Sequence, residues 1–180
     1  MKHQPRVLVI SAWLLLGSAV ASGAEMAVQA CFSPQGRCST HIIREIAKAQ
    51  KELLIAVYAF TNDELARAVA QAKKRGVSVQ IVLDREFDAG NEKSLGKFLE
   101  EQKIPVRRVT GMKPPTPEKE PGLMHQKFSV IDRKIVFTGS YNWTRSADNS
   151  NDENLLWFRD AGPLAEEYRK VFFRLWERKG

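Results

Sequence analysis

The chain has 180 residues, of which 43% are hydrophobic and 27% are charged. This length suits one domain, and the composition is ordinary for a folded globular protein, which excludes a fibrous or broadly disordered chain. The formal net charge is +7. A basic excess of this size is compatible with a polyanionic ligand, such as DNA, RNA or an anionic lipid surface, but it does not distinguish between them.

The N-terminus has the three parts of a secretory signal peptide. The basic residues Lys2 and Arg6 precede an apolar run at residues 7–16, and small residues follow up to Ala24. We expect residues 1–24 to be removed, and the mature chain to be periplasmic or secreted without stable membrane association. An uncleaved anchor is the alternative, because the apolar stretch approaches the roughly 17–20 residues that span a bilayer.

The first element expected in the mature chain is a helix that Ser39 or Thr40 caps and that runs through Gln50. Just before it lie the only two cysteines, Cys31 and Cys38. In an oxidising compartment they can close a small loop, worth roughly 2–3 kcal/mol of stability. A metal site is the alternative, but two thiols without a cluster of further ligands make a poor one, so we expect a disulfide.

Strand and helix patterns then alternate. Thr61 and Glu64 have the form of a capping box for a helix that ends at Gly76, a residue suited to a left-handed stop. A further helix is expected at residues 91–102. Apolar runs predict strands at residues 53–60, 77–83 and 104–109. This alternation predicts one α/β domain over residues 25–180, with a mixed, largely parallel β-sheet flanked by helices.

The pattern changes in the last third of the chain. Residues 110–121 are rich in proline and charge, which predicts a surface loop. Short apolar runs on either side of a polar turn then predict a β-hairpin, and one more strand and a closing helix follow. The expected ranges are 123–131 and 135–138 for the hairpin, 154–158 for the strand and 164–178 for the helix.

The residues with the most specific chemistry lie in the predicted hairpin. His125 and Lys127 are two positions apart, so on a strand both project from the same face. The lysine charge disfavours the imidazolium form of the histidine. A neutral imidazole beside a bound phosphate is a competent nucleophile. The pair therefore predicts a site for a phosphate ester.

Three further residues support this interpretation. Asp132 begins the hairpin turn, where we expect it to hold the turn or to pair with a cation rather than to act as the attacking base. Ser140 and Asn142 share a face on the return side, and their hydroxyl and amide can donate to phosphate oxygens. The chain lacks the common zinc and calcium motifs, so this predicted phosphate-binding site is expected to need no metal or other cofactor.

The full pattern resembles the HKD motif of the phospholipase D superfamily: His125-x-Lys127-x4-Asp132-x6-Gly139-Ser140-x-Asn142. Glu153, in the run 151–154, is similar to the acidic residue that supports the catalytic histidine in short bacterial Nuc-type endonucleases. The likeness covers essentially the whole mature chain. It implies a phospholipase D-like domain whose catalytic residues are His125, Lys127, Asp132 and Glu153, with phosphate bound by Lys127, Ser140 and Asn142.

The resemblance also implies a partner subunit. Members of the family use two histidines, one that attacks phosphorus and one that protonates the leaving oxygen, whereas the mature chain holds only His41 and His125. His41 lies on a predicted helix without motif neighbours, and we expect it to be an exposed helix residue. The second imidazole is therefore expected to be His125 of another copy, in a two-fold homodimer with the site at its interface.

The expected function is metal-independent cleavage of DNA, and of RNA as a second substrate, through a phosphohistidine. A phospholipase or cardiolipin hydrolase is one alternative, and a non-catalytic extracellular DNA-binding module is another. Trp143 either stacks a base or belongs to the core. Basic residues near the motif are candidates for contacts with the nucleic-acid backbone: Arg107, Arg108, Lys113, Arg133 and Lys134.

Overall fold

The computed structural model describes residues 26–112 and 122–178. The predicted signal peptide and residues 113–121 of the predicted surface loop lie outside this range. The strands are β1 (Ala27–Ser33), β2 (Glu52–Val57), β3 (Ser78–Asp84), β4 (Val106–Val109), β5 (Lys127–Ile131), β6 (Ile135–Gly139) and β7 (Glu153–Arg159). The helices are α1 (Cys38–Lys48), α2 (Asp63–Lys74), α3 (Arg85–Gly90), α4 (Gly96–Glu101), α5 (Arg145–Asn149) and α6 (Gly162–Trp176). None of these helices is both long and apolar enough to cross a bilayer.

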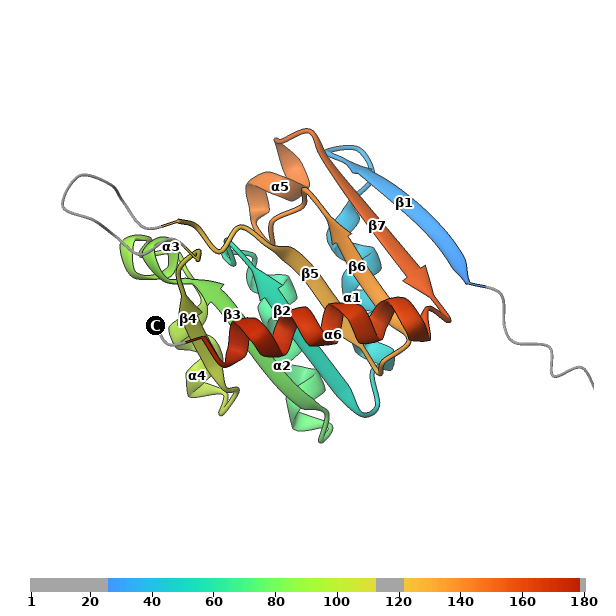
Figure 1. Ribbon diagram of the computed structural model, residues 1–180. Coiled ribbons are helices and arrows are strands. Elements are labelled where there is room, and N and C mark those ends of the chain that lie inside the picture. The colour runs from blue at the N-terminus through green and yellow to red at the C-terminus, as the bar shows by residue number, and fades with distance from the viewer. Residues whose placement is uncertain (1–25, 113–121, 179–180) are drawn as a thin grey trace, which may run out of the picture.

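The strands form one seven-stranded sheet in the order β1-β7-β6-β5-β2-β3-β4, as Figure 1 shows. The predicted single α/β domain with a mixed sheet is confirmed. The sheet is not largely parallel, however, because only β2–β3 and β3–β4 pair in parallel. These strands are joined by helical crossovers, whereas β5 and β6 are joined by a tight turn, which permits only antiparallel pairing.

The sheet carries helices on both faces. Helices α1 and α2 cover one face and α6 crosses the other (Figure 1). Leu53 and Ile55 of β2 pack into the core on the α1–α2 side, and Leu54 and Ala56 pack into the core under α6. A central strand that is buried on both faces accounts for the unbroken apolar run that predicted it. The edge strand β1 was not predicted, because most of its residues are exposed and leave no apolar alternation.

Two predicted helix caps are wrong. Helix α1 begins at Cys38, so Ser39 lies inside its first turn and caps nothing. At α2 the cap is Asn62, whose side chain accepts hydrogen bonds from the amides of Glu64 and Leu65, while the Thr61 amide donates to the Trp143 carbonyl. The predicted left-handed stop after α2 is confirmed at Gly76, where φ is 93°.

The region between β3 and β4 holds two short helices in place of the single helix predicted at residues 91–102. Helix α4 occupies only the second half of that range, and α3 precedes it. The side chain of Asp84 caps α3 by accepting a hydrogen bond from the Phe87 amide. A capped helix of six residues is too short to show the apolar periodicity on which the prediction depended.

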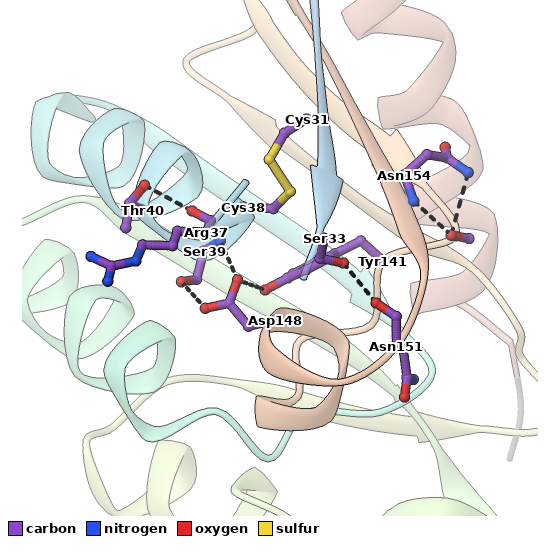
Figure 2. The surroundings of a disulfide bond; sticks show 11 residues. Cys31, Ser33, Arg37, Cys38, Ser39, Thr40, Tyr141, Asp148, Asn151 and Asn154 are labelled. Atoms are coloured by element: carbon purple, nitrogen blue, oxygen red, sulfur yellow. Dashed lines mark hydrogen bonds between the residues drawn. A yellow bond between two sulfur atoms is a disulfide. The ribbon is translucent and has the colours of Figure 1, made fainter. Parts of the chain in front are cut away.

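The predicted disulfide is confirmed. Cys31 of β1 is bonded to Cys38 at the start of α1, with their Cα atoms 5.7 Å apart. The bond therefore joins the edge strand to the first helix, close to the segment that leads into β7 (Figure 2). His41, one turn further along α1, is half-buried rather than exposed, because its ring stacks on Trp157 at a centroid distance of 4.6 Å.

Candidate active site

The predicted site residues gather at one end of the sheet. Strand β5 runs antiparallel to both β2 and β6, and Lys127 is paired with Val57 while Gly139 is paired with Leu155. The start of β5, the end of β6 and the start of β7 therefore meet at the end where β2 and β3 terminate. This end of the sheet carries His125, Lys127, Ser140, Asn142 and Glu153.

His125 and Lys127 lie together, although the strand alternation used to predict this is wrong in detail. Strand β5 begins only at Lys127, so His125 precedes it. Both side chains meet Tyr58: the His125 and Tyr58 ring centroids are 4.9 Å apart, and the Lys127 ammonium lies 5.2 Å from the Tyr58 centroid. The ammonium also donates to the His125 carbonyl at 2.9 Å. Tyr58 thus supplies the surface on which the two groups are arranged.

Asp84 holds the segment before His125 in place and was not predicted as a site residue. It is 0% exposed at the end of β3. Its Oδ2 accepts a hydrogen bond from the Met124 amide at 2.8 Å, and its Oδ1 accepts one from the Phe87 amide. A carboxylate at the end of the apolar run 81–83 was the available signal in the sequence, because such a charge is rarely buried without a defined role.

The charges around His125 set its protonation. Burial lowers the pKa of the His125 imidazole, the nearby Lys127 ammonium lowers it further, and the Asp84 carboxylate opposes both effects. Burial likewise lowers the pKa of Lys127, while Glu153 and Asp84 act in the opposite direction. The imidazole is therefore held in its neutral, nucleophilic form over more of the pH range than a free histidine would be.

The two neighbouring charges predict opposite titration shifts in two variants. Lys127→Met should raise the pKa of His125, because a positive charge that disfavours imidazolium is removed. Asp84→Asn should lower it, because a favourable negative charge is lost. Nuclear magnetic resonance titration of the imidazole measures both, and His41, which stacks on Trp157, is the internal reference that should not move. Shifts of the same sign in both variants would contradict the assignment.

Ser140 and Glu153 are bonded to each other. The Ser140 hydroxyl donates to Glu153 Oε2 at 2.5 Å and accepts from the Asn154 amide at 3.1 Å. The other carboxylate oxygen of Glu153 accepts from the Asn151 side chain. Within one chain Glu153 therefore orients Ser140 and makes no hydrogen bond to His125 in the described residues. Its charge nevertheless reaches Lys127, whose ammonium it favours.

The side chain of Asn142 has a hydrogen-bond acceptor without a partner in the part of the chain that the structure describes. This acceptor, Oδ1, is buried. Gly139 shapes the same segment: its φ is 141°, and a Cβ atom there would collide with the Asn154 carbonyl oxygen. Only glycine, which has no Cβ, permits the two backbones to approach this closely.

Asp132 is not part of this constellation. It lies at the opposite end of β5, about 16 Å from Lys127 at the usual rise per residue of a strand. Its carboxylate accepts hydrogen bonds from the amides of Gln50, Lys51 and Glu52. These three bonds join the hairpin turn to the start of β2. The structural role predicted from its place in the turn is confirmed, and these contacts lie at the opposite end of β5 from His125 and Lys127.

The expected accessory residues are also placed differently. Trp143 is buried in the core, edge-on to Phe60, so it cannot stack a base. Arg133 and Lys134 lie in the turn at the Asp132 end of β5. Arg108 forms ion pairs with Asp88 and Glu100, and the guanidinium of Arg107 lies over Trp176. Lys113 lies outside the described residues.

Within residues 26–112 and 122–178, no three histidine, cysteine, aspartate or glutamate side chains are grouped closely enough to hold a metal ion. The groups at this end of the sheet offer one imidazole, one ammonium, one hydroxyl and one amide. Such a set can supply a nucleophile and neutralise the charge of a phosphodiester.

Comparison with known proteins agrees with this arrangement. Residues 42–176 match the family described as "Cardiolipin synthase, PLD-like domain". The chain therefore belongs to the phospholipase D-like family.

Among individual proteins, a mitochondrial cardiolipin hydrolase of Canis lupus familiaris is 34% identical over 152 residues, which is 82% of this chain and 54% of that protein. The chain thus spans about half the length of this relative. Two solved structures match nearly all of their own chains. Nuc from Salmonella typhimurium, described as a phospholipase D family member, has a TM-score of 0.74 and 28% identity over 84% of this chain and 95% of its own. NucT from Helicobacter pylori has a TM-score of 0.75 and 29% identity over 85% and 97%.

Proposed function

We propose that the mature chain is an exported phosphodiesterase that cleaves DNA, and RNA as a second substrate, without a divalent metal and with little sequence preference. The observation that carries the proposal is the placement of the His125 imidazole and the Lys127 ammonium side by side on Tyr58. Their surroundings lower the pKa of His125. A module that only binds DNA needs cations, but it does not need a nucleophile poised in this way.

The proposed reaction has two displacements. A neutral His125 imidazole attacks phosphorus, one P–O bond breaks, and a second imidazolium gives its proton to the departing oxygen. Water then attacks the phosphohistidine, loses its proton to the second imidazole and releases a phosphomonoester. Lys127 and Asn142 hold the phosphate oxygens throughout.

The second imidazole requires another copy of the chain. The only other histidine of the mature chain, His41, stacks on Trp157. Across the sheet, Trp157 of β7 is paired with Phe137 of β6, and Phe137 is paired with Ser129 of β5. Ser129 lies four residues beyond His125. This places His41 about 13 Å further along the sheet at the usual strand rise, too far to act on the same phosphorus. A two-fold homodimer in which each chain contributes His125 meets the requirement.

Nucleic acid is the favoured substrate because the chain is basic and nearly coextensive with Nuc and NucT. A lipid phosphodiester is the second candidate, and one observation supports it besides the likeness to a cardiolipin hydrolase. Leu123 and Met112 are 51% and 87% exposed beside the segment that carries His125. Exposed apolar residues next to a site are what a lipid enzyme would present to a bilayer.

Parallel assays on plasmid DNA and on cardiolipin vesicles, both with excess EDTA, test the proposal. Plasmid should be nicked, and the rate should fall at least about tenfold when salt rises from about 50 to about 200 mM, because phosphate contacts release counterions. The matched variant Leu123→Ser separates the substrates. It should leave plasmid cleavage unchanged and should slow vesicle hydrolysis only if lipid is the substrate. Vesicle hydrolysis without plasmid cleavage would establish the lipid alternative and end the nuclease proposal.

A further inference from the structure

Tyr141 lies between the two residues proposed to bind phosphate, Ser140 and Asn142, and points into the core. It is 1% exposed, and its hydroxyl donates to Asp148 Oδ1 at 2.8 Å. Burial and this hydrogen bond raise the pKa of the Tyr141 hydroxyl. The hydroxyl therefore stays protonated to higher pH than that of a free tyrosine, and it can donate to Asp148 over that range.

Asp148, on the short helix α5, also holds the beginning of α1. Its Oδ1 accepts a hydrogen bond from the Ser39 amide at 3.0 Å, and its Oδ2 accepts one from the Ser39 hydroxyl at 2.6 Å. Helix α1 has no side-chain cap of its own. A carboxylate from another element thus satisfies a free amide at the positive end of α1 and joins this helix to the phosphate-binding segment.

The disulfide fixes the other side of this connection. Cys38 directly precedes Ser39, and its partner Cys31 lies in β1, two residues before Ser33. The Ser33 hydroxyl donates to the Asn151 carbonyl at 3.2 Å, near the end of the same segment. The disulfide joins the end of β1 to the start of α1. These two elements therefore hold the 140–153 segment at two points, through Asp148 and through Asn151, as Figure 2 shows.

We propose that Asp148 is a positioning residue for phosphate binding, which fixes Ser140 and Asn142 through Tyr141 and is itself anchored by Ser39 beside the Cys31–Cys38 disulfide. This role rests on the proposed phosphodiesterase function. Asp148 touches no substrate. Its loss acts by letting the segment move, so that the hydroxyl and the amide are no longer held where a phosphate would be bound.

Steady-state hydrolysis of bis(p-nitrophenyl) phosphate by the mature protein tests the role. Asp148→Ala should raise KM about tenfold, which corresponds to the loss of one to two well-formed hydrogen bonds. Tyr141→Phe is the milder variant, because it removes one oxygen and leaves Ser39 bonded to Asp148. It should raise KM about threefold with little change in Tm. The double variant Cys31→Ala/Cys38→Ala should also raise KM.

The matched control is Glu45→Gln on the same helix. The Glu45 carboxylate accepts a hydrogen bond from Arg159 at the far end of β7. Replacing this carboxylate with the neutral amide of glutamine therefore weakens a different connection between α1 and the sheet. This variant should lower Tm and leave KM unchanged. An equal rise of KM in Glu45→Gln and Asp148→Ala would show that any loosening of α1 has this effect, and it would overturn the proposal.

Amide hydrogen exchange provides a readout that does not depend on activity. Exchange at residues 139–144 should be faster in Asp148→Ala than in the wild type and unchanged in Glu45→Gln. If the wild type does not hydrolyse the substrate, the proposed function fails, yet this experiment still decides whether Asp148 holds the segment. Wild-type exchange together with a wild-type KM in Asp148→Ala would exclude the positioning role.

Discussion

His125→Ala is expected to abolish phosphodiester cleavage, with a fall in kcat on the order of 10⁴-fold or more, because the variant lacks the proposed nucleophile and His41 is stacked on Trp157 away from it. The fold should survive. His125 is exposed and packs only edge-on against Tyr58, so its truncation should change stability by less than about 1 kcal/mol. Initial rates on plasmid DNA with excess EDTA, together with a thermal unfolding curve, measure both effects.

His41→Ala is the matched control for this experiment. It removes the other histidine of residues 25–180, which stacks on Trp157 away from the site, and should retain near-wild-type cleavage. Tm should fall modestly, because a stacked, half-buried ring is lost. Full activity in His125→Ala, or a loss in His41→Ala as large as that expected for His125→Ala, would refute the assignment of the nucleophile.

The second large effect is expected from mixed dimers. When wild-type and His125→Ala chains are co-expressed in equal amounts, random pairing leaves about a quarter of the dimers with two imidazoles. If each site takes one imidazole from each chain, as proposed, cleavage should fall to about a quarter of the wild-type rate per total protein, whereas independent subunits would retain about half. Rates across a series of mixing ratios should follow the square of the wild-type fraction.

Co-expression with His41→Ala chains is the control and should give no such fall. A linear dependence on the wild-type fraction, or a protein that sediments as a monomer at concentrations where it is fully active, would rule out the shared site. In that case the acid would have to be a group other than histidine.

The sequence by itself determined the fold class, the disulfide and the residues of the motif. Apolar runs and glycine stops report local conformation, and the central strand β2 is buried on both faces as its composition indicated. The motif could be identified from the sequence because residues that are close together within one hairpin also lie close together in space. His125 and Lys127 are close in space because they are close in sequence.

The tertiary structure decided what depends on contacts between distant parts of the chain. Asp84 holds the His125 segment from 40 positions away, and Asp148 caps α1 from 109 positions away. Neither hydrogen bond can be predicted from the local pattern of apolar and polar residues. The same holds for Asp132, whose place in the motif suggested catalysis but whose carboxylate is committed to the amides at the start of β2. The sequence motif specifies which chemical groups the chain contains, whereas the packing of the strands decides which of these groups lie at the same end of the sheet.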